Sequence, residues 1–477
     1  MKKRIISFAL VIASVLSVLC ISTGAASIDF FSEKNLRHAE NIVKAMRNFE
    51  DEYSFGDDRI TKEELNCIVQ IVNYNYPDIF ILTENNSYSY KYYTDNATGE
   101  TIITKLKLEY TVDRKTYERI VDDVIEPWVE SVVSLTNSSF SELEYAVFFH
   151  DYLCANYSYD NTLRIHSLHE FITEGTGVCQ SYMYAYMALL RRVGVEVTWI
   201  CSEDMNHAWN QVKIDGEWYN VDATWDDPKN NTTGAANHGF LLKSDAAFTG
   251  NEKNPHYNWI SANKCTSTKY DSVDFGGSRS PFAFLKGKWY YISNGDLYVT
   301  DSPDVAGNCI RDFDNIWFVW GSTSRYYTSS YSCLLAYEGR LYLNTPKTII
   351  RVNPDGADEV VSEYNGDDGY IYGMAVDLGE GGVNGAAFRA GRVKVAVTTS
   401  PDAQGNLIDY KLPAYYAADA GDVNGDGKLN LKDASLLMKY IAKWDVTVDM
   451  THADFDENGK VNVTDVSKAL KRIAGWY

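Results

Sequence analysis

The dipeptide Asp215-Gly216 constrains the fold of this chain more than any other local feature. It lies between two short runs rich in strand-forming residues, 210–214 (Asn-Gln-Val-Lys-Ile) and 217–221 (Glu-Trp-Tyr-Asn-Val). Asp-Gly between alternating apolar and polar runs is typical of a two-residue β-hairpin turn. We therefore predict an antiparallel hairpin over 210–221.

The predicted hairpin brings two chemically useful side chains together. A two-residue loop pairs Ile214 with Glu217, and continuing this pairing places Asp222 opposite Trp209. His207 then lies diagonally across from Asp222 on the same face, with about 7–8 Å between the Cα atoms. That separation lets an imidazole and a carboxylate form a hydrogen bond.

A cysteine is predicted at the start of a helix. Cys179 follows the segment 175–178 (Gly-Thr-Gly-Val), and apolar residues then recur at helical spacing as far as Gly194, which suits a C-terminal cap. The unpaired N–H groups of a first helical turn favour a thiolate and can bind an oxyanion. Cys179, His207 and Asp222 are thus a candidate catalytic triad, and the alternative is an inert thiol with a histidine and an aspartate of the core.

Three ordered motifs resemble the core motifs of the bacterial transglutaminase-like superfamily over about residues 140–245. They are Gly177-Val178-Cys179, Asn206-His207-Ala208-Trp209-Asn210-Gln211-Val212 and Trp218-Tyr219-Asn220-Val221-Asp222-Ala223-Thr224-Trp225-Asp226-Asp227-Pro228. The resemblance implies a papain-like α+β fold in which Cys179 is the nucleophile, His207 the base and Asp222 the orienting acid. The spacing assigns no role to Gln180, Tyr157 or Trp225, which are further candidates for the oxyanion region or the acyl pocket.

The resemblance leaves the reaction open, because relatives include transglutaminases, peptidases, amidases and inactive binding forms. All the active ones form an acyl-thioester, and they differ in whether water or an amine accepts the acyl group. We expect a cysteine protease or amidase that hydrolyses amide bonds of protein. The alternatives are a protein-crosslinking transglutaminase and a non-catalytic binding or structural subunit.

Two twelve-residue segments near the C-terminus carry a calcium-loop pattern. Segments 422–433 and 454–465 have oxygen-bearing side chains at positions 1, 3, 5, 9 and 12 and glycine at position 6. Each runs directly into an amphipathic helical pattern, without a clear entering helix. The predicted ligands, with lysine carbonyls at position 7, are Asp422, Asn424, Asp426, Lys428, Asn430 and Asp433 in the first loop and Asp454, Asp456, Asn458, Lys460, Asn462 and Asp465 in the second.

The duplicated loops resemble a dockerin module that covers residues 419–477. This resemblance implies a small all-α domain that binds two Ca²⁺ ions and attaches to a cohesin module of a scaffold protein, as in cellulosomes. Loop positions 10 and 11 are Leu431-Lys432 in the first repeat and Val463-Thr464 in the second. The two faces differ, which departs from the symmetric binding of some dockerins.

The N-terminus reads as a secretory signal peptide. Basic residues at 2–4 precede an apolar run over 5–21, and small residues follow up to Ala26. The alternative is an uncleaved anchor. We expect export, with no membrane span after cleavage.

The middle of the chain changes to short aromatic strands separated by Gly, Asn and Asp turns. The segment 285–291 (Leu-Lys-Gly-Lys-Trp-Tyr-Tyr) is echoed by 337–343 (Tyr-Glu-Gly-Arg-Leu-Tyr-Leu), 52 positions later. This repetition is typical of propeller or sandwich β repeats, although the region is short for a closed propeller. Its aromatic residues form either the core of a spacer or a surface that binds a polymer.

Composition excludes some partners. The chain has 44 Lys and Arg against 65 Asp and Glu, a formal net charge of −21, which does not suit nucleic-acid binding. The seven cysteines after Cys20 lack regular spacing, which argues against a disulfide framework or a zinc ribbon.

We therefore expect a multidomain, secreted, scaffold-attached cysteine enzyme that acts on protein or peptide substrates exposed during polysaccharide breakdown. The substrate class is inferred from the dockerin resemblance alone. The predicted parts are a signal peptide (1–26), an α+β lead-in (27–135), a transglutaminase-like catalytic domain (136–274), an all-β middle module (275–413) and a dockerin (419–477).

Overall fold

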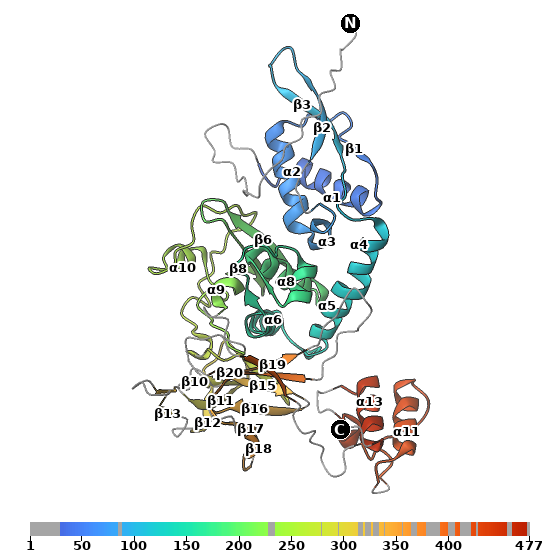
Figure 1. Cartoon of the computed structure of the whole chain (residues 1–477), viewed down its shortest axis with the longest axis vertical. Coiled ribbons are helices and arrows are strands. Elements are labelled where there is room, and N and C mark those ends of the chain that lie inside the picture. The colour runs from blue at the N-terminus through green and yellow to red at the C-terminus, as the bar shows by residue number, and fades with distance from the viewer. Residues whose placement is uncertain are drawn as a thin grey trace.

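A computed structural model gives the arrangement of most of the chain (Figure 1). The described residues are 29–83, 88–227, 234–277, 279–293, 295–312, 318–319, 326–327, 333–337, 339–354, 356–363, 370–377, 392–398, 406–410, 421–425, 428–455 and 460–474. The predicted signal peptide and the ligands Asp426, Asp456 and Asn458 lie outside them. Among these residues, no helix is both long and apolar enough to cross a membrane.

The N-terminal region packs short helices on a three-stranded antiparallel sheet. The sheet has the order β1 (Glu52–Ser54), β3 (Thr101–Lys107), β2 (Ser89–Thr94). The helices are α1 (Glu33–Arg47), α2 (Lys62–Asn75) and α3 (Pro77–Phe80). Ser32 caps α1, and Thr61 with Glu64 forms a capping box on α2, which fixes where each helix begins.

The helical segment that ends the predicted lead-in forms in three parts. These are α4 (Arg114–Ile120), a π-helical turn (Val121–Ile125) and α5 (Glu126–Val133). Within the turn, the Glu126 N–H donates to the Val121 carbonyl, five residues back. Pro127 has no N–H, and its ring crowds the carbonyl four residues earlier, so the helix widens just before it.

The region that carries Cys179, His207 and Asp222 is α+β, as the sequence predicted. Its antiparallel sheet runs β6 (Val197–Ser202), β7 (His207–Ile214), β8 (Glu217–Val221), and β7 pairs with β8 in the predicted register, from Ile214–Glu217 to Asn210–Val221. A short parallel pair, β4 (Ser158–Tyr159) and β5 (Thr176–Gly177), precedes the cysteine helix. The helices are α6 (Glu142–Asn156), α7 (Leu168–Glu174), α8 (Cys179–Arg192), α9 (Ala223–Asp226) and α10 (Asp245–Thr249).

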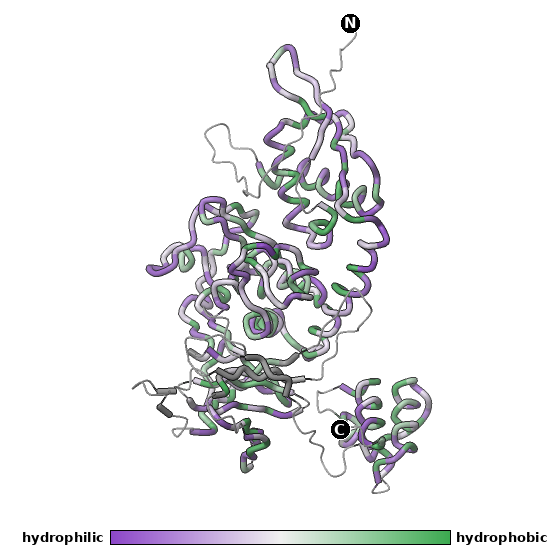
Figure 2. Tube along the Cα trace, in the orientation of Figure 1, coloured by the Kyte–Doolittle hydropathy of each residue, from purple (hydrophilic) through white to green (hydrophobic). Residues whose placement is uncertain are grey.

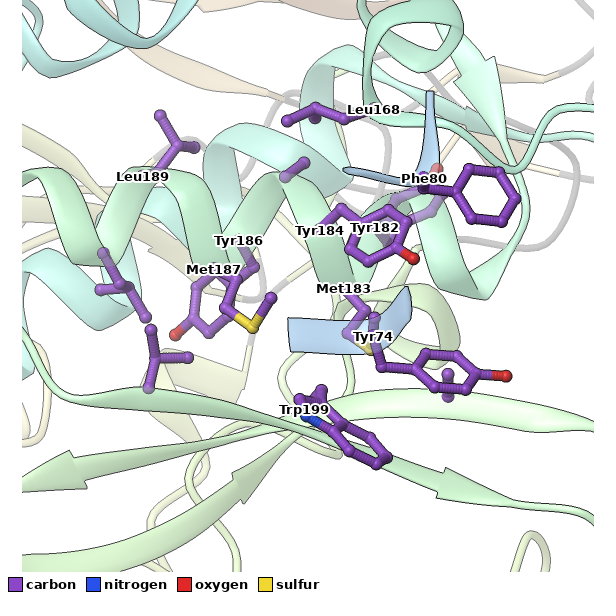
Figure 3. Packing of buried hydrophobic residues seen from close by; sticks show 14 of the residues in the cluster. Tyr74, Phe80, Leu168, Tyr182, Met183, Tyr184, Tyr186, Met187, Leu189 and Trp199 are labelled. Atoms are coloured by element: carbon purple, nitrogen blue, oxygen red, sulfur yellow. The ribbon is translucent and has the colours of Figure 1, made fainter. Parts of the chain in front are cut away.

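Helix α8 lies in the middle of the largest hydrophobic core. Most of its side chains are buried (Figure 3), and it packs on α6 and on strand β7. Figure 2 shows α6 end-on, with green hydrophobic residues beside purple hydrophilic ones, and ten of its residues are buried. On the sheet side, Trp199 stacks on Tyr74 of α2 with the ring centroids 5.0 Å apart. One cluster of buried residues therefore runs from Ala39 to Tyr291, across the predicted boundary at 135/136.

The middle region consists of antiparallel sheets. Two four-stranded meanders repeat along the chain, and their first hairpins are the two echoed segments of the sequence. The first is β9 (Ala283–Leu285), β10 (Lys288–Ser293), β11 (Asp296–Thr300), β12 (Asn308–Arg311), and the second is β15 (Leu334–Tyr337), β16 (Arg340–Asn344), β17 (Thr348–Val352), β18 (Glu359–Glu363). Further pairs and sheets are formed by β13 (Phe318–Val319), β14 (Tyr326–Tyr327), β19 (Tyr370–Asp377), β20 (Arg392–Thr398) and β21 (Asn406–Tyr410).

The aromatic residues of the echoed hairpins face inward. Trp289, Tyr290, Tyr291 and Tyr342 are all buried. Of the two predicted roles, core packing or polymer binding, the structure supports core packing. These aromatic residues pack within the middle module and against the region that carries Cys179. The predicted propeller-like closure stays a prediction.

The C-terminal region is a small helical unit, coloured red in Figure 1. It contains α11 (Leu431–Ile441), α12 (Met450–Ala453) and α13 (Val463–Ile473). Its core is small and includes Val423, Leu437 and Val466. The two long helices pack on each other, and each begins within the last three residues of one predicted calcium loop.

Candidate active site

Cys179 is the first residue of α8, as the sequence predicted. Strand β5 leads into it, and the N-cap residue Val178 has an extended backbone, so the chain turns sharply into the helix. Cys179 is partly exposed, whereas the helix behind it is buried. The N-terminal end of a helix carries partial positive charge, which stabilises a thiolate and an oxyanion formed on a carbonyl carbon attacked there.

His207 and Asp222 meet across the hairpin. The Nε2 of His207 lies 2.6 Å from Oδ2 of Asp222, and both side chains are buried. The other carboxylate oxygen of Asp222 accepts hydrogen bonds from the backbone N–H groups of Thr224 and Trp225, at 3.0 and 3.1 Å. Asp222 is therefore also the N-cap of α9, which fixes its carboxylate plane.

The electrostatics favour a charged histidine beside the cysteine. Burial lowers the pKa of His207, but the charge and hydrogen bond of Asp222 and a hydrogen bond with Cys179 together raise it to about 10. Burial would raise the pKa of Asp222, yet His207 and His256 hold it below its usual range. With Nε2 on Asp222, the Nδ1 atom of His207 is the one that serves Cys179. The geometry suits a thiolate–imidazolium pair.

Aromatic rings enclose this histidine. The imidazole of His207 stacks on Trp209, with centroids 5.6 Å apart, and on Trp225, at 5.0 Å. These contacts hold the plane of the buried ring. Trp225, one of the further candidates from the sequence, thus borders the triad.

The other two sequence candidates make hydrogen bonds within the core. The Gln180 amide donates to the Tyr184 hydroxyl at 2.7 Å. The Tyr157 hydroxyl accepts from Trp128, and its ring stacks on Phe171. Their part in an oxyanion site or acyl pocket stays a prediction.

The sequence reasoning missed two residues near the triad. Nε2 of His256 lies 2.9 Å from the same Oδ2 atom of Asp222 that His207 contacts. Burial raises the pKa of Tyr159 to about 12, and the charges of Cys179, Asp160 and Asp222 act in the same direction. No local pattern marks His256, which reaches Asp222 from 34 residues away; Tyr159 lies in the segment 156–160 that precedes the core motifs.

A buried polar network supports the turn that carries Asp222. Both oxygens of Asp226 accept from the Phe240 N–H, and Oδ2 also lies 3.1 Å from Nε2 of His150. Nδ1 of His150 contacts Asp151, which is also bonded to His238. Burial lowers the pKa of His150, but the charge of Cys154 and the hydrogen bonds with Asp151 and Asp226 raise it well above the usual value. Both ring nitrogens face a carboxylate oxygen, so a charged imidazole can donate to two carboxylates.

The described parts of the calcium loops fit an oxygen-liganded cation. Asp422, Asp433 and Asp465 are almost completely buried, and a buried carboxylate requires compensating partners. Asp433 accepts from the backbone N–H of Asn424 at 3.3 Å and of Asn430 at 2.9 Å.

The asparagines at position 9 also cap the helices that follow. The side chain of Asn430 accepts from the Lys432 N–H at 3.0 Å, and Asn462 caps α13 in the same way at 2.8 Å. Asn430 also donates to the Lys428 carbonyl. Asp454 and Lys460 border the undescribed part of the second loop.

Comparisons with known proteins gave matches to two parts of this chain, the region that carries the candidate triad and the C-terminal region. Residues 130–223 match the family model of the transglutaminase-like superfamily, and residues 420–473 match that of the dockerin type I domain. The chain therefore contains a transglutaminase-like domain. At its C-terminus it carries a dockerin type I domain.

Similar solved structures include a TGase and a protein described as a candidate cysteine protease from Cytophaga hutchinsonii. Each is 18% identical to this chain; the TM-scores are 0.19 and 0.17. The matches cover 29% and 28% of this chain, and 44% and 61% of the other chains, so this chain spans less than two thirds of either. A search of curated proteins gave no match.

Proposed function

We propose that this protein is a cysteine hydrolase that cleaves amide bonds of protein and is carried by its dockerin on an extracellular scaffold. The observation that supports the activity is the 2.6 Å contact between His207 and Asp222, beside a cysteine at a helix start. The match to the transglutaminase-like superfamily supports the same acyl-transfer chemistry.

In the acylation step, Sγ of Cys179 attacks the carbonyl carbon of the scissile amide. The C=O electron pair moves to oxygen, and N–H groups of the first turn of α8 stabilise the oxyanion. When the carbonyl re-forms, the C–N bond breaks and His207 Nδ1 gives its proton to the leaving amine. The product is a thioester on Cys179.

In the deacylation step, His207 is the base. Its Nδ1 removes a proton from water, and the resulting hydroxide attacks the thioester carbon. The C–S bond breaks, the acid product leaves, and the sulfur again pairs with the protonated His207. Asp222 stays ionised throughout and holds the imidazole so that Nδ1 faces the sulfur.

The dockerin match supports a cohesin module as partner and attachment to a cellulosome or cell-surface scaffold. The predicted signal peptide is consistent with export. The ligands predicted above would hold one Ca²⁺ ion in each loop, two in all. Bound calcium would supply charge compensation for the buried carboxylates and so stabilise the fold of this small domain.

Mass spectrometry tests the proposal. The mature protein is incubated with a peptide library, with and without a primary amine, beside the Cys179→Ala variant. We expect new peptide termini that depend on Cys179 and form without the amine. Amine-shifted peptides with no new termini would instead indicate a crosslinking transglutaminase, and identical results for both proteins would indicate a binding subunit.

A further inference from the structure

Asp222 accepts more hydrogen bonds than a triad aspartate needs for one histidine. Its Oδ1 atom accepts two backbone N–H groups, and its Oδ2 atom lies between two imidazoles, 2.6 Å from His207 and 2.9 Å from His256. His256 is 0% exposed. A second buried histidine on the same oxygen is a feature that the proposed mechanism does not use.

Packing and nearby charges determine the protonation state of His256. Its ring lies against Trp225, Phe248 and Trp209, with centroids 4.1, 4.3 and 4.8 Å apart, and its backbone N–H donates to the Phe248 carbonyl at 3.0 Å. Burial lowers the pKa of His256, although Asp222 acts in the opposite direction. Its Nδ1 atom is buried and has no hydrogen-bond partner among the described residues. The ring is therefore neutral, with its proton on Nε2.

We propose that His256 is a positioning residue for the Cys179–His207 pair: its neutral Nε2–H donates to Asp222 and limits how tightly this carboxylate holds the His207 proton. The inference rests on the proposed function of the triad. It assigns no contact between His256 and substrate.

The physical reason is the sharing of one acceptor. A carboxylate oxygen that already accepts a hydrogen bond has less negative charge for a second donor, so each bond is weaker than it would be alone. The charged or titratable groups that act on His256 are His207, Asp222 and Asp226; from the other side it meets the rings of Phe240 and Phe248. Without His256, Asp222 would hold the His207 proton more strongly. Proton transfer to the leaving amine would then be slower.

Two variants separate this role from simple packing. In His256→Gln, the side-chain amide places an N–H donor near the position of Nε2, whereas His256→Phe fills the space without a donor. The measured quantity is the rate at which iodoacetamide alkylates Cys179 at each pH from 4 to 11. Mass spectrometry of the Cys179 peptide monitors the alkylation. This rate reports the thiolate–imidazolium pair and needs no substrate.

We expect the alkaline transition of the alkylation profile to move to higher pH in His256→Phe and to stay near that of the unmodified protein in His256→Gln. On a cleaved peptide, His256→Phe should lose about tenfold in kcat with little change in KM, the scale of one hydrogen bond to a charged group. If His256→Phe does not fold, His256→Asn, whose shorter amide does not reach Oδ2, replaces it.

An unchanged alkaline transition in His256→Phe, or equal shifts in both variants, would overturn the inference while leaving the triad intact. If the profile of the unmodified protein shows no activated thiol at Cys179, the proposed function fails instead. The two failures are thus distinguishable.

Discussion

Gly177 is the position where one added methyl group should disturb the site most directly. It is buried in β5, two residues before Cys179. A Cβ at this position would lie 2.6 Å from the Phe171 ring and 2.7 Å from both Cβ and Oγ of Ser181, whereas ordinary contacts begin near 3.4 Å. Neither neighbour can yield easily, because the Phe171 ring is stacked on Tyr157 and Ser181 is tied to the Ile165 carbonyl.

Gly177→Ala must therefore push the start of α8 away from β5 by several tenths of an ångström. Overpacking of this kind costs about 1–3 kcal/mol of unfolding free energy. A displacement near 1 Å between reacting groups costs on the order of a hundredfold in rate, so we expect a tenfold or greater loss in Cys179 alkylation and in peptide cleavage.

Denaturant unfolding measures the first effect, and the alkylation assay measures the second. Gly239→Ala is the matched control, since its Cβ would meet only Asp226, at an ordinary 3.6 Å; its effect should stay within about 0.5 kcal/mol. If Gly177→Ala instead has the stability and alkylation rate of the control, the close packing of β5 against Phe171 and Ser181 is refuted.

Three further changes test other parts of the structure. His150→Phe leaves Asp151 and Asp226 without their shared cation and should cost about 3–5 kcal/mol in denaturant unfolding. Burial raises the pKa of Asp227 from 3.8 to about 8, so this group contributes stability below about pH 4 that is lost as the pH rises through 8; Asp227→Asn should flatten the fall in unfolding free energy between pH 5 and 8. Asp433→Asn should reduce the calcium-dependent rise in melting temperature of the C-terminal helices, followed by circular dichroism with and without a chelator.

The parts of the site that follow local rules could be predicted from the sequence. The Asp-Gly turn fixes the β7–β8 register, and that register alone brings His207 to Asp222. The start of α8 at Cys179 follows from the glycines before it and the apolar spacing after it. Both features involve residues within about fifteen positions of each other.

The residues that sequence reasoning missed depend on long-range packing. His256 reaches Asp222 because α10 and the loop after it fold over the end of β8, and a single histidine beside a proline carries no signal of that contact. His150 and His238 come together from segments 88 positions apart through Asp151. Burial of these polar groups is a property of the whole core, so no window of sequence reveals it.

The same network shows why the middle module is more than a spacer. Oδ2 of Asp151 accepts the backbone N–H of Phe282, just before β9, at 2.8 Å. Asp151 holds His150, His150 holds Asp226, and Asp226 ends the short helix that Asp222 caps. Trp289 of β10 adds a hydrogen bond to Glu144 on α6 at 2.8 Å. Buried polar contacts thus join the first strands of the middle module to Asp226, whose backbone N–H donates to the carbonyl of Asp222 at 3.1 Å. The module is structurally part of the unit that carries the candidate triad.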